Sequence, residues 1–241
     1  NNQAGPVGPD QATPIQTMRW EIARANRGLI NAMAVCPTAE RIAIGGQSAR
    51  GANGDIILMD VDRYEVEGSL PATRDDQTAL PGHKQSVTSI DFSPDGNRVV
   101  SSGSDGNVWL WTAPPGGPGP WTFAELRPAY GSRLFNEQPA IFLSPDLVAV
   151  AEPLDPNTYA QWRIALYSLA GGIRRVGELP QPHQGRVSTM SRSRDGQLWA
   201  SADDAGHVFL WTAGPQPTAR VLRHWGRIPS SLSFGPGGGL L

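Results

Sequence analysis

The pattern of apolar and polar positions predicts a series of short β-strands. In residues 87–92, VTSIDF, apolar and polar side chains alternate, as in a strand with one buried face. The turn-forming residues SPDG follow at 93–96, an extended pattern resumes in NRVVSS, and SDGN leads into VWLW at 108–111. Fourth strands are predicted in WTFAEL at 121–126, IRRVGEL at 173–179 and TARVLRH at 218–224. Because no segment shows sustained helical periodicity, we expect an all-β fold.

Self-comparison of the chain shows that this unit is repeated. Residues 83–111 align without a gap with residues 183–211, so that His83 pairs with His183 and Trp111 with Trp211. Weaker copies are marked by the turn after each first strand: CPTAE at 36–40, SPDG at 93–96, SPD at 144–146, SRDG at 193–196 and GPGG at 235–238. The second residues of these turns follow one another at intervals of 57, 51, 49 and 42 residues. A four-stranded propeller blade has a similar period, about 40 to 45 residues, so loop insertions explain the excess.

The best copy resembles the WD40 repeat, which runs from a Gly-His pair through a turn Asp to a Trp-Asp at the end of the third strand. Gly82, His83, Asp105 and Trp111 match this pattern, and Thr112 stands where the family has its last Asp. The resemblance implies a β-propeller of four-stranded antiparallel blades over residues 19–241. This chain would supply four full repeats and part of a fifth, and the propeller would therefore be incomplete.

The resemblance also implies a hydrogen-bonded set of side chains inside each blade. In the best copy this set is His83, Ser101, Asp105 and Trp111. In the second copy His183, Ser201 and Trp211 match, but Ala205 stands at the Asp position. We therefore expect either that Asp204 substitutes or that this network is open. The blades around Met59 and Tyr167 lack both the His and the Trp, and we expect them to rely on apolar packing.

Partner contacts are implied at family positions near the start of each first strand and before the turn Asp. In the two good copies these positions are Lys84, Ser86, Ser104, Gln184, Arg186 and Asp204. Trp225 lies in a neighbouring loop between blades, and its large amphipathic ring is of the kind that anchors interfaces. We predict that these seven residues contact other proteins or peptides.

Charge and cysteine content narrow the classes of function. The net charge of -2 and the isoelectric point near 6.1 give no general attraction to nucleic acid or to anionic membranes. Cys36 is the one cysteine, and the four histidines show no metal-ligand spacing, so no disulfide, metal or other cofactor is expected. No apolar run is long enough for a membrane span, and the start lacks the pattern of an export signal, so we expect a cytoplasmic protein.

Three functions are compatible with this sequence. The leading hypothesis is a non-catalytic scaffold that binds proteins or peptides through its loops, without a small-molecule substrate. The alternative is a propeller hydrolase or oxidoreductase with a site in the central channel, although the repeats show no series of acidic, His or cofactor-binding residues there. A structural array without ligand is the third. The Ser, His and Asp of the best copy are interpreted as a structural set, because the set ends in a Trp and partly recurs 100 residues later.

The ends of the sequence predict a module of a larger protein. Residues 1–18 are rich in Pro, Gly, Gln and Asn and are interpreted as a flexible linker or tail, with MRWEIARA at 18–25 resembling the outer strand that closes a WD40 ring. The last residues, LSFGPGGGLL, stop after a first strand and its turn. We expect a bacterial multidomain protein, and the almost complete use of Arg in place of Lys indicates GC-rich codon usage.

Overall fold

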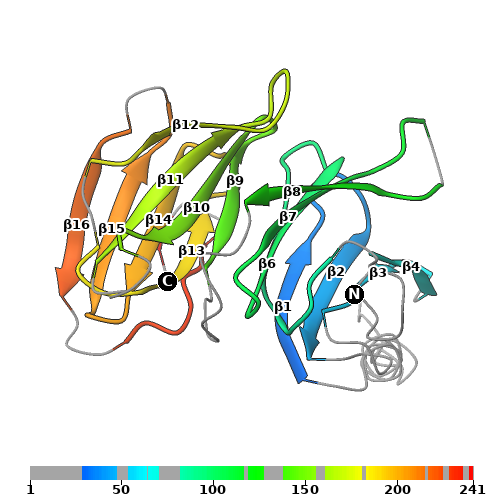
Figure 1. The fold of residues 1–241 in the computed structure, drawn as a ribbon, viewed down its shortest axis with the longest axis horizontal. Coiled ribbons are helices and arrows are strands. Elements are labelled where there is room, and N and C mark those ends of the chain that lie inside the picture. The colour runs from blue at the N-terminus through cyan, green and yellow to red at the C-terminus, as the bar shows by residue number, and fades with distance from the viewer. Residues whose placement is uncertain are drawn as a thin grey trace, which may run out of the picture.

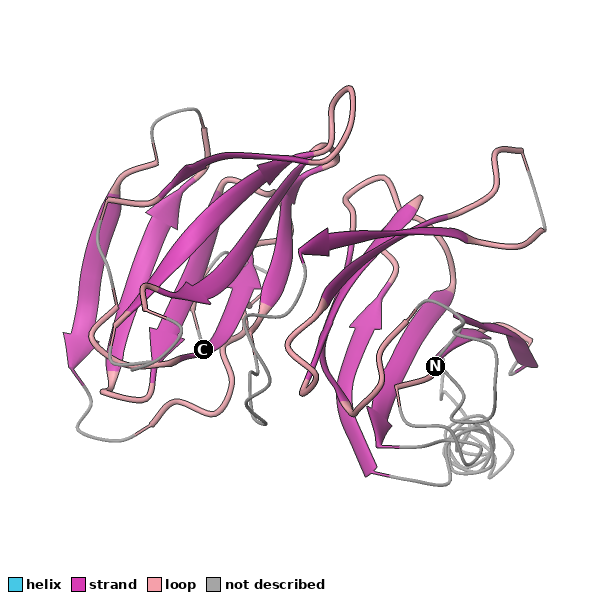
Figure 2. Cartoon of the chain, viewed as in Figure 1, coloured by secondary structure: helices cyan, strands magenta, loops and turns pink. Residues whose placement is uncertain are grey.

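The computed structural model describes residues 29–47, 54–63, 65–70, 82–116, 119–127, 138–155, 161–180, 183–214, 217–224, 228–235 and 239–240. In this part of the chain all regular secondary structure is β-strand and no residue is helical (Figure 2), which confirms the predicted all-β fold. No helix long and apolar enough to cross a membrane occurs among these residues. Residues 1–28, which include the predicted linker and the predicted closing strand, and Trp225 lie outside the described residues.

The strands form four antiparallel sheets, each built from four consecutive strands. Sheet 1 contains β1 (Leu29–Val35), β2 (Arg41–Gln47), β3 (Ile56–Asp60) and β4 (Glu65–Leu70). Sheet 2 contains β5 (Val87–Phe92), β6 (Arg98–Gly103), β7 (Val108–Thr112) and β8 (Thr122–Arg127). Sheet 3 contains β9 (Ala140–Ser144), β10 (Leu147–Pro153), β11 (Trp162–Ser168) and β12 (Arg174–Glu178). Sheet 4 contains β13 (Val187–Arg192), β14 (Leu198–Asp203), β15 (His207–Thr212) and β16 (Ala219–His224).

The sheets follow one another in chain order from β1 to β16 (Figure 1). The first strand of each sheet contacts the first strand of the next, so β1, β5, β9 and β13 are the inner strands of neighbouring blades. This arrangement is that of a β-propeller. Beyond the fourth sheet, the described residues add one further bridge, between Phe234 and Leu240.

The turn between the first and second strands is built by the same residues in sheets 2 and 4. Ser93 Oγ accepts from the Arg98 N–H at 2.9 Å, and Gly96 has a φ of 72°, a left-handed conformation that favours glycine. Ser193 accepts from the Leu198 N–H at the same distance, and Gly196 has a φ of 70°. The SPDG and SRDG sequences therefore form turns, as predicted.

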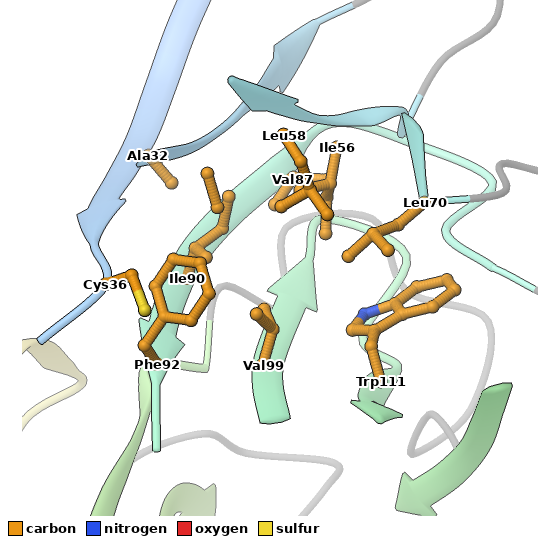
Figure 3. Packing of buried hydrophobic residues seen from close by; sticks show 11 residues of the cluster. Ala32, Cys36, Ile56, Leu58, Leu70, Val87, Ile90, Phe92, Val99 and Trp111 are labelled. Atoms are coloured by element: carbon orange, nitrogen blue, oxygen red, sulfur yellow. The ribbon is translucent and has the colours of Figure 1, made fainter. Parts of the chain in front are cut away.

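Apolar side chains are buried between neighbouring sheets. Figure 3 shows the cluster between sheets 1 and 2, where Ile56, Leu58 and Leu70 meet Val87 and other residues of sheet 2, among them Ile90, Phe92, Val99 and Trp111. Similar clusters fill the spaces between sheets 2 and 3 and between sheets 3 and 4. Trp109 and Phe209 pack against the first and third of these clusters, so both aromatic rings serve packing between sheets. Each sheet thus hides its apolar face against the next one.

Candidate partner-binding face

A buried hydrogen-bonded network joins four side chains of sheet 2. His83 Nε2 lies 2.8 Å from Ser101 Oγ, which also accepts from Trp111 Nε1 at 2.8 Å. On its other side, His83 Nδ1 lies 3.2 Å from Asp105 Oδ1. His83, Ser101 and Trp111 are fully buried, so their polar atoms need partners inside the protein. The structure therefore brings together the four residues that the family resemblance implies.

The burial of this network argues against a catalytic role for its serine. Burial raises the pKa of Asp105, but hydrogen bonds from His83 and from the Lys84 and Asn107 N–H groups outweigh burial and leave the pKa below its ordinary value. An ionised carboxylate only accepts, so His83 Nδ1 donates to Asp105 Oδ1. Ser101 is fully buried and its Oγ already accepts from Trp111 Nε1, so it presents no nucleophile to a substrate.

The same carboxylate fixes the loop that precedes β5. Asp105 Oδ2 accepts from the Lys84 N–H at 2.7 Å, and the Ser104 N–H donates to the Ser86 carbonyl oxygen at 2.8 Å. These bonds join the loop before the first strand to the turn between the second and third strands. The backbone of the predicted contact residues in sheet 2 is therefore held in one conformation.

Sheet 4 contains a complete network as well. His183 Nε2 lies 2.9 Å from Ser201 Oγ, and Trp211 Nε1 donates to the same oxygen at 2.9 Å. His183 Nδ1 lies 3.0 Å from Oδ2 of Asp203, which is fully buried. The expectation that Asp204 substitutes or that the network is open was wrong, because Asp203 completes it from the end of β14.

The pair Asp203 and Ala205 reverses the pair Gly103 and Asp105 at the corresponding positions. A Cβ atom on Gly103 would lie 2.5 Å from His83 Nδ1 and 2.8 Å from Asp105 Oδ1, so no side chain fits there while Asp105 holds the ring. In sheet 4 the earlier residue, Asp203, carries the carboxylate, and the later residue is the small Ala205. Each network therefore contains one carboxylate, supplied from alternative positions.

In sheet 2, Asp105 binds both the buried histidine and the loop before the first strand. In sheet 4, two aspartates share these two roles. Asp203 holds His183, and its Oδ1 also accepts from the His207 N–H at 2.8 Å. Asp204 Oδ1 accepts from the Arg186 N–H at 2.8 Å, and the Asp204 N–H donates to the Arg186 carbonyl oxygen at 2.9 Å. Asp204 therefore fixes the loop before β13, while Asp203 fixes the buried ring.

Sheet 3 replaces the His and Trp by a Tyr and a Glu. Tyr167 pairs with Val148, the second residue of β10, just as Trp111 pairs with Val99, the second residue of β6. Glu152 is the sixth residue of β10, the place of Gly103 in β6 and Asp203 in β14. The Tyr167 hydroxyl donates to Glu152 Oε1 at 2.5 Å, and Glu152 is fully buried.

Three arginines surround the buried Glu152. Arg163 Nε lies 3.4 Å from Glu152 Oε2, Arg175 Nη2 lies 3.9 Å from the same oxygen, and Arg127 Nε lies 3.8 Å from Oε1. The expected apolar packing between sheets is present, since Tyr167 belongs to the cluster between sheets 2 and 3, and Ile56 and Leu58 of sheet 1 pack against sheet 2. The buried charged group around Glu152 was not predicted.

Contacts between sheets place these features at one end of the molecule, which we call the loop face. Arg127 Nη2 donates to the carbonyl oxygen of Gly106, in the turn of sheet 2, and Arg127 also faces Glu152 of sheet 3. The Trp162 N–H, at the start of β11, donates to the His183 carbonyl oxygen at 2.9 Å. The loop face thus comprises residues 82–86 and 103–107 of sheet 2, 183–186 and 203–207 of sheet 4, and the start of β11 with its neighbours Glu152, Arg175 and Glu178.

The predicted contact residues lie on this face. Lys84 and Gln184 are exposed, and the side chains of Ser86, Ser104, Arg186 and Asp204 are partly exposed. Asn31 Nδ2 donates to Ser86 Oγ at 2.6 Å, so Ser86 also contacts the inner strand of sheet 1. Their role in binding a partner stays a prediction. The sequence reasoning missed Glu152, Arg163, Arg175 and Asp203, although counting residues along each second strand would have aligned Glu152 with Asp203.

Four-stranded antiparallel sheets in series, with a buried His–Ser–Trp network closed by a carboxylate, define a β-propeller with WD40-type blades. Comparison with known families agrees, because residues 75–112 match the model of the WD domain, G-beta repeat. This chain therefore carries a WD40 repeat in sheet 2, and its fold is that of a WD40-type β-propeller.

Several curated proteins are similar to parts of this chain. The chain is 20% identical over 189 residues to a guanine nucleotide-binding protein subunit beta of Solanum tuberosum, a match that covers 70% of this chain and 47% of the relative. It is 32% identical over 79 residues to a WD40 repeat-containing protein of Dictyostelium discoideum, covering 33% of this chain and 10% of the relative. It is 32% identical over 95 residues to mouse Striatin-4, covering 39% of this chain and 12% of the relative. The chain thus spans about half or less of each relative, and a bacterial source stays a prediction.

Proposed function

We propose that this chain is a non-catalytic scaffold that binds proteins or peptides through its loop face. The observation that carries the proposal is the anchoring of the loops before β5 and β13 by Asp105 and Asp204. Loops held in one conformation lose little entropy on binding, which favours recognition of a partner. The name of one relative supports the proposal, since it is a subunit of a guanine nucleotide-binding protein and so acts within an assembly.

The enzyme alternative has less support from the described residues. The Ser–His–Asp set of sheet 2 is buried and satisfied, and no group of three or more His, Cys, Asp or Glu side chains in the described part could hold a metal ion. A cytoplasmic location, and the absence of nucleic acid, membrane and small-molecule partners, stay part of the proposal.

Lys84 allows a sharp test, because it is the one lysine of the chain. With the N-terminal amine acetylated, a short amine-reactive crosslinker attaches only at Lys84. Incubated with a lysate of the source organism, the protein should yield discrete adducts, which mass spectrometry identifies. Lys84→Arg keeps the charge but removes the reactive amine and is the labelling control.

Substitutions on the face complete the test. A pull-down with Arg186→Glu should lose the crosslinked partner, whereas Arg194→Glu should retain it. Arg194 lies in the turn at the opposite end of sheet 4, is exposed, and undergoes the same charge change. Equal recovery of the partner by both folded variants would show that the binding surface lies outside the loop face.

A further inference from the structure

We propose that the loop face binds an acidic segment of its partner, whose carboxylate or phosphoryl groups dock on Arg163 and Arg175 in place of Glu178. This inference rests on the proposed scaffold function and names the chemistry of the partner.

The two guanidinium groups share one oxygen of a surface carboxylate. Arg163 Nη1 lies 3.2 Å from Glu178 Oε2, and Arg175 Nη2 donates to the same atom at 2.8 Å. The side chains of Arg163, Arg175 and Glu178 are 24%, 39% and 47% exposed, so the group opens to solvent. A guanidinium presents five N–H donors in a planar fork that suits carboxylate and phosphate oxygens. Glu178 therefore occupies, with one oxygen, a place that an incoming anion can take.

Glu152 and Glu178 differ in how easily they can be displaced. Glu152 is fully buried and is held by the Tyr167 hydroxyl at 2.5 Å and by Arg127 from sheet 2. It keeps Arg163 in place from the inner side, at 3.4 Å from its Nε. Glu178 lies on the outermost strand of the sheet, β12, and can turn into solvent when another anion arrives. The buried carboxylate thus positions the arginine, and the exposed one is exchangeable.

The surroundings on the loop face favour an acidic partner. Asp105 and Asp203 are engaged with buried histidines, and Glu152 is buried, so these carboxylates do not face the solvent. Among the described residues of this face, the exposed or partly exposed charged side chains are Lys84, Arg163, Arg175 and Arg186 against Asp155, Asp204 and Glu178. Among the described residues of the face, the four cationic side chains thus outnumber the three carboxylates, although the whole chain has a net charge of -2. Complementary charge at such a face steers and orients a partner.

The test measures fluorescence anisotropy of labelled Gly/Ser peptides with the full chain at low ionic strength. One peptide carries several Glu residues, a second carries phosphoserine at the same positions, and a third carries Gln. We expect binding of at least one acidic peptide and none of the Gln peptide. Comparison of the first two distinguishes carboxylate from phosphoryl recognition. Binding should weaken as salt is added, because exposed charges are screened.

Two variants with opposite expected effects make the test independent of folding defects. Glu178→Gln should raise the affinity for the acidic peptide roughly threefold to tenfold, and Arg175→Gln should lower it by a similar factor. Arg174→Gln is the matched control, since Arg174 is the neighbouring exposed residue of β12 and makes no hydrogen bond or ion pair with Glu178. Its affinity should stay within about twofold of the unaltered chain.

The proposal is overturned if no acidic peptide binds, if the Gln peptide binds equally, or if Arg174→Gln and Arg175→Gln weaken binding equally. The scaffold function fails separately, in the pull-down. If Arg186→Glu loses the crosslinked partner while Arg175→Gln retains it, the loop face is correct and acidic docking on sheet 3 is wrong.

Discussion

Asp203 holds the buried ring of His183 through a 3.0 Å hydrogen bond to Nδ1, from the strand position that is Gly103 in sheet 2. The carboxylate has moved two residues along the chain, yet it meets the same nitrogen of the histidine. The network thus constrains where the charge lies in space and leaves open which residue carries it. Glu152 occupies the same strand position in sheet 3, where Tyr167 is its partner.

The first prediction follows from this exchange of positions. Asp203→Gly should lower the free energy of unfolding by about 1 to 3 kcal/mol, because His183 Nδ1 and the His207 N–H lose a buried acceptor. Adding Ala205→Asp should restore most of the loss, since it recreates the Gly–Asp arrangement of sheet 2. Urea unfolding of the single and double variants measures both steps. A double variant no more stable than Asp203→Gly would show that the two positions are not interchangeable.

The second prediction compares the two buried histidines. Each has both ring nitrogens bonded, and the rings of His183 and Phe209 meet edge to face with centroids 4.6 Å apart. His83→Ala and His183→Ala should therefore each destabilise by about 1 to 3 kcal/mol, with His183→Ala at least as costly. An incomplete network in sheet 4 would predict the reverse order. Thermal unfolding of the two variants side by side separates these outcomes, with the partly exposed His207→Ala as the milder control.

The sequence predicts those features of the fold that depend on residues close together in the chain, and it predicts features that depend on contacts in space less well. Alternation in VTSIDF predicts β5 at its observed bounds, 87–92, because the period of two is set by neighbouring residues. The SPDG turn is predicted for the same reason. A residue-by-residue alignment does not find the role of Asp203, because it aligns Asp105 with Ala205, whereas the carboxylate of sheet 4 comes from Asp203, two residues earlier. The complementary pairs Gly103–Asp105 and Asp203–Ala205 were nevertheless visible in the sequence.

The candidate site was predicted less completely than the fold. Lys84 and Arg186 follow from the repeat, since the family pattern assigns their positions. The cluster around Glu152 does not, because Arg163, Arg175 and Arg127 come from three strands and meet only after β8, β11 and β12 are placed. No local pattern marks such a cluster in advance.

The third prediction concerns pH. Asp91 lies on the inner strand β5, and its Oδ2 accepts from the Phe142 N–H of β9 at 2.8 Å. Burial raises the pKa of Asp91 to about 6, although the Phe142 N–H and the charge of Arg192 act in the opposite direction. The folded protein therefore holds this proton more tightly than the unfolded chain, whose Asp has a pKa of about 3.9. The stabilisation from protonating Asp91 is full below about pH 4 and is lost as the pH rises through 6.

Asp91→Asn isolates this effect, because the amide oxygen can still accept from Phe142. The variant should be more stable than the unaltered chain at pH 7.5, by about 1 to 2 kcal/mol, a figure reduced because Asp91 is partly exposed. The difference in stability should shrink toward pH 4. Asp105 and Asp203, whose pKa values are lowered, act in a separate window, because their stabilisation is lost only as the pH falls below about 4. Denaturant unfolding across pH 4 to 7.5 makes the measurement. A constant difference between variant and unaltered chain would contradict the raised pKa.

The fourth prediction compares equivalent positions on the inner strands of sheets 1 and 2. Met33 pairs with the fourth residue of β2, and Ile90 pairs with the fourth residue of β6, so the two have the same place in their sheets. Met33 is 59% exposed, whereas Ile90 is 8% exposed against sheet 1. Val35 and Phe92 form a second such pair, at 67% and 1% exposure. The surface that is buried in sheet 2 is therefore open in sheet 1 of this chain.

Truncating the buried and the exposed member of each pair should therefore lower the free energy of unfolding by very different amounts. Ile90→Ala should lower the free energy of unfolding by about 2 to 4 kcal/mol, because it removes buried methyl groups and leaves a cavity between the sheets. Met33→Ala should change it by less than about 0.5 kcal/mol, because little apolar surface leaves the protein interior. The matched pair Phe92→Ala and Val35→Ala should repeat the contrast, with a loss of about 3 to 5 kcal/mol for Phe92. If Met33→Ala destabilised this chain as much as Ile90→Ala, the side of β1 that carries Met33 would be covered in solution.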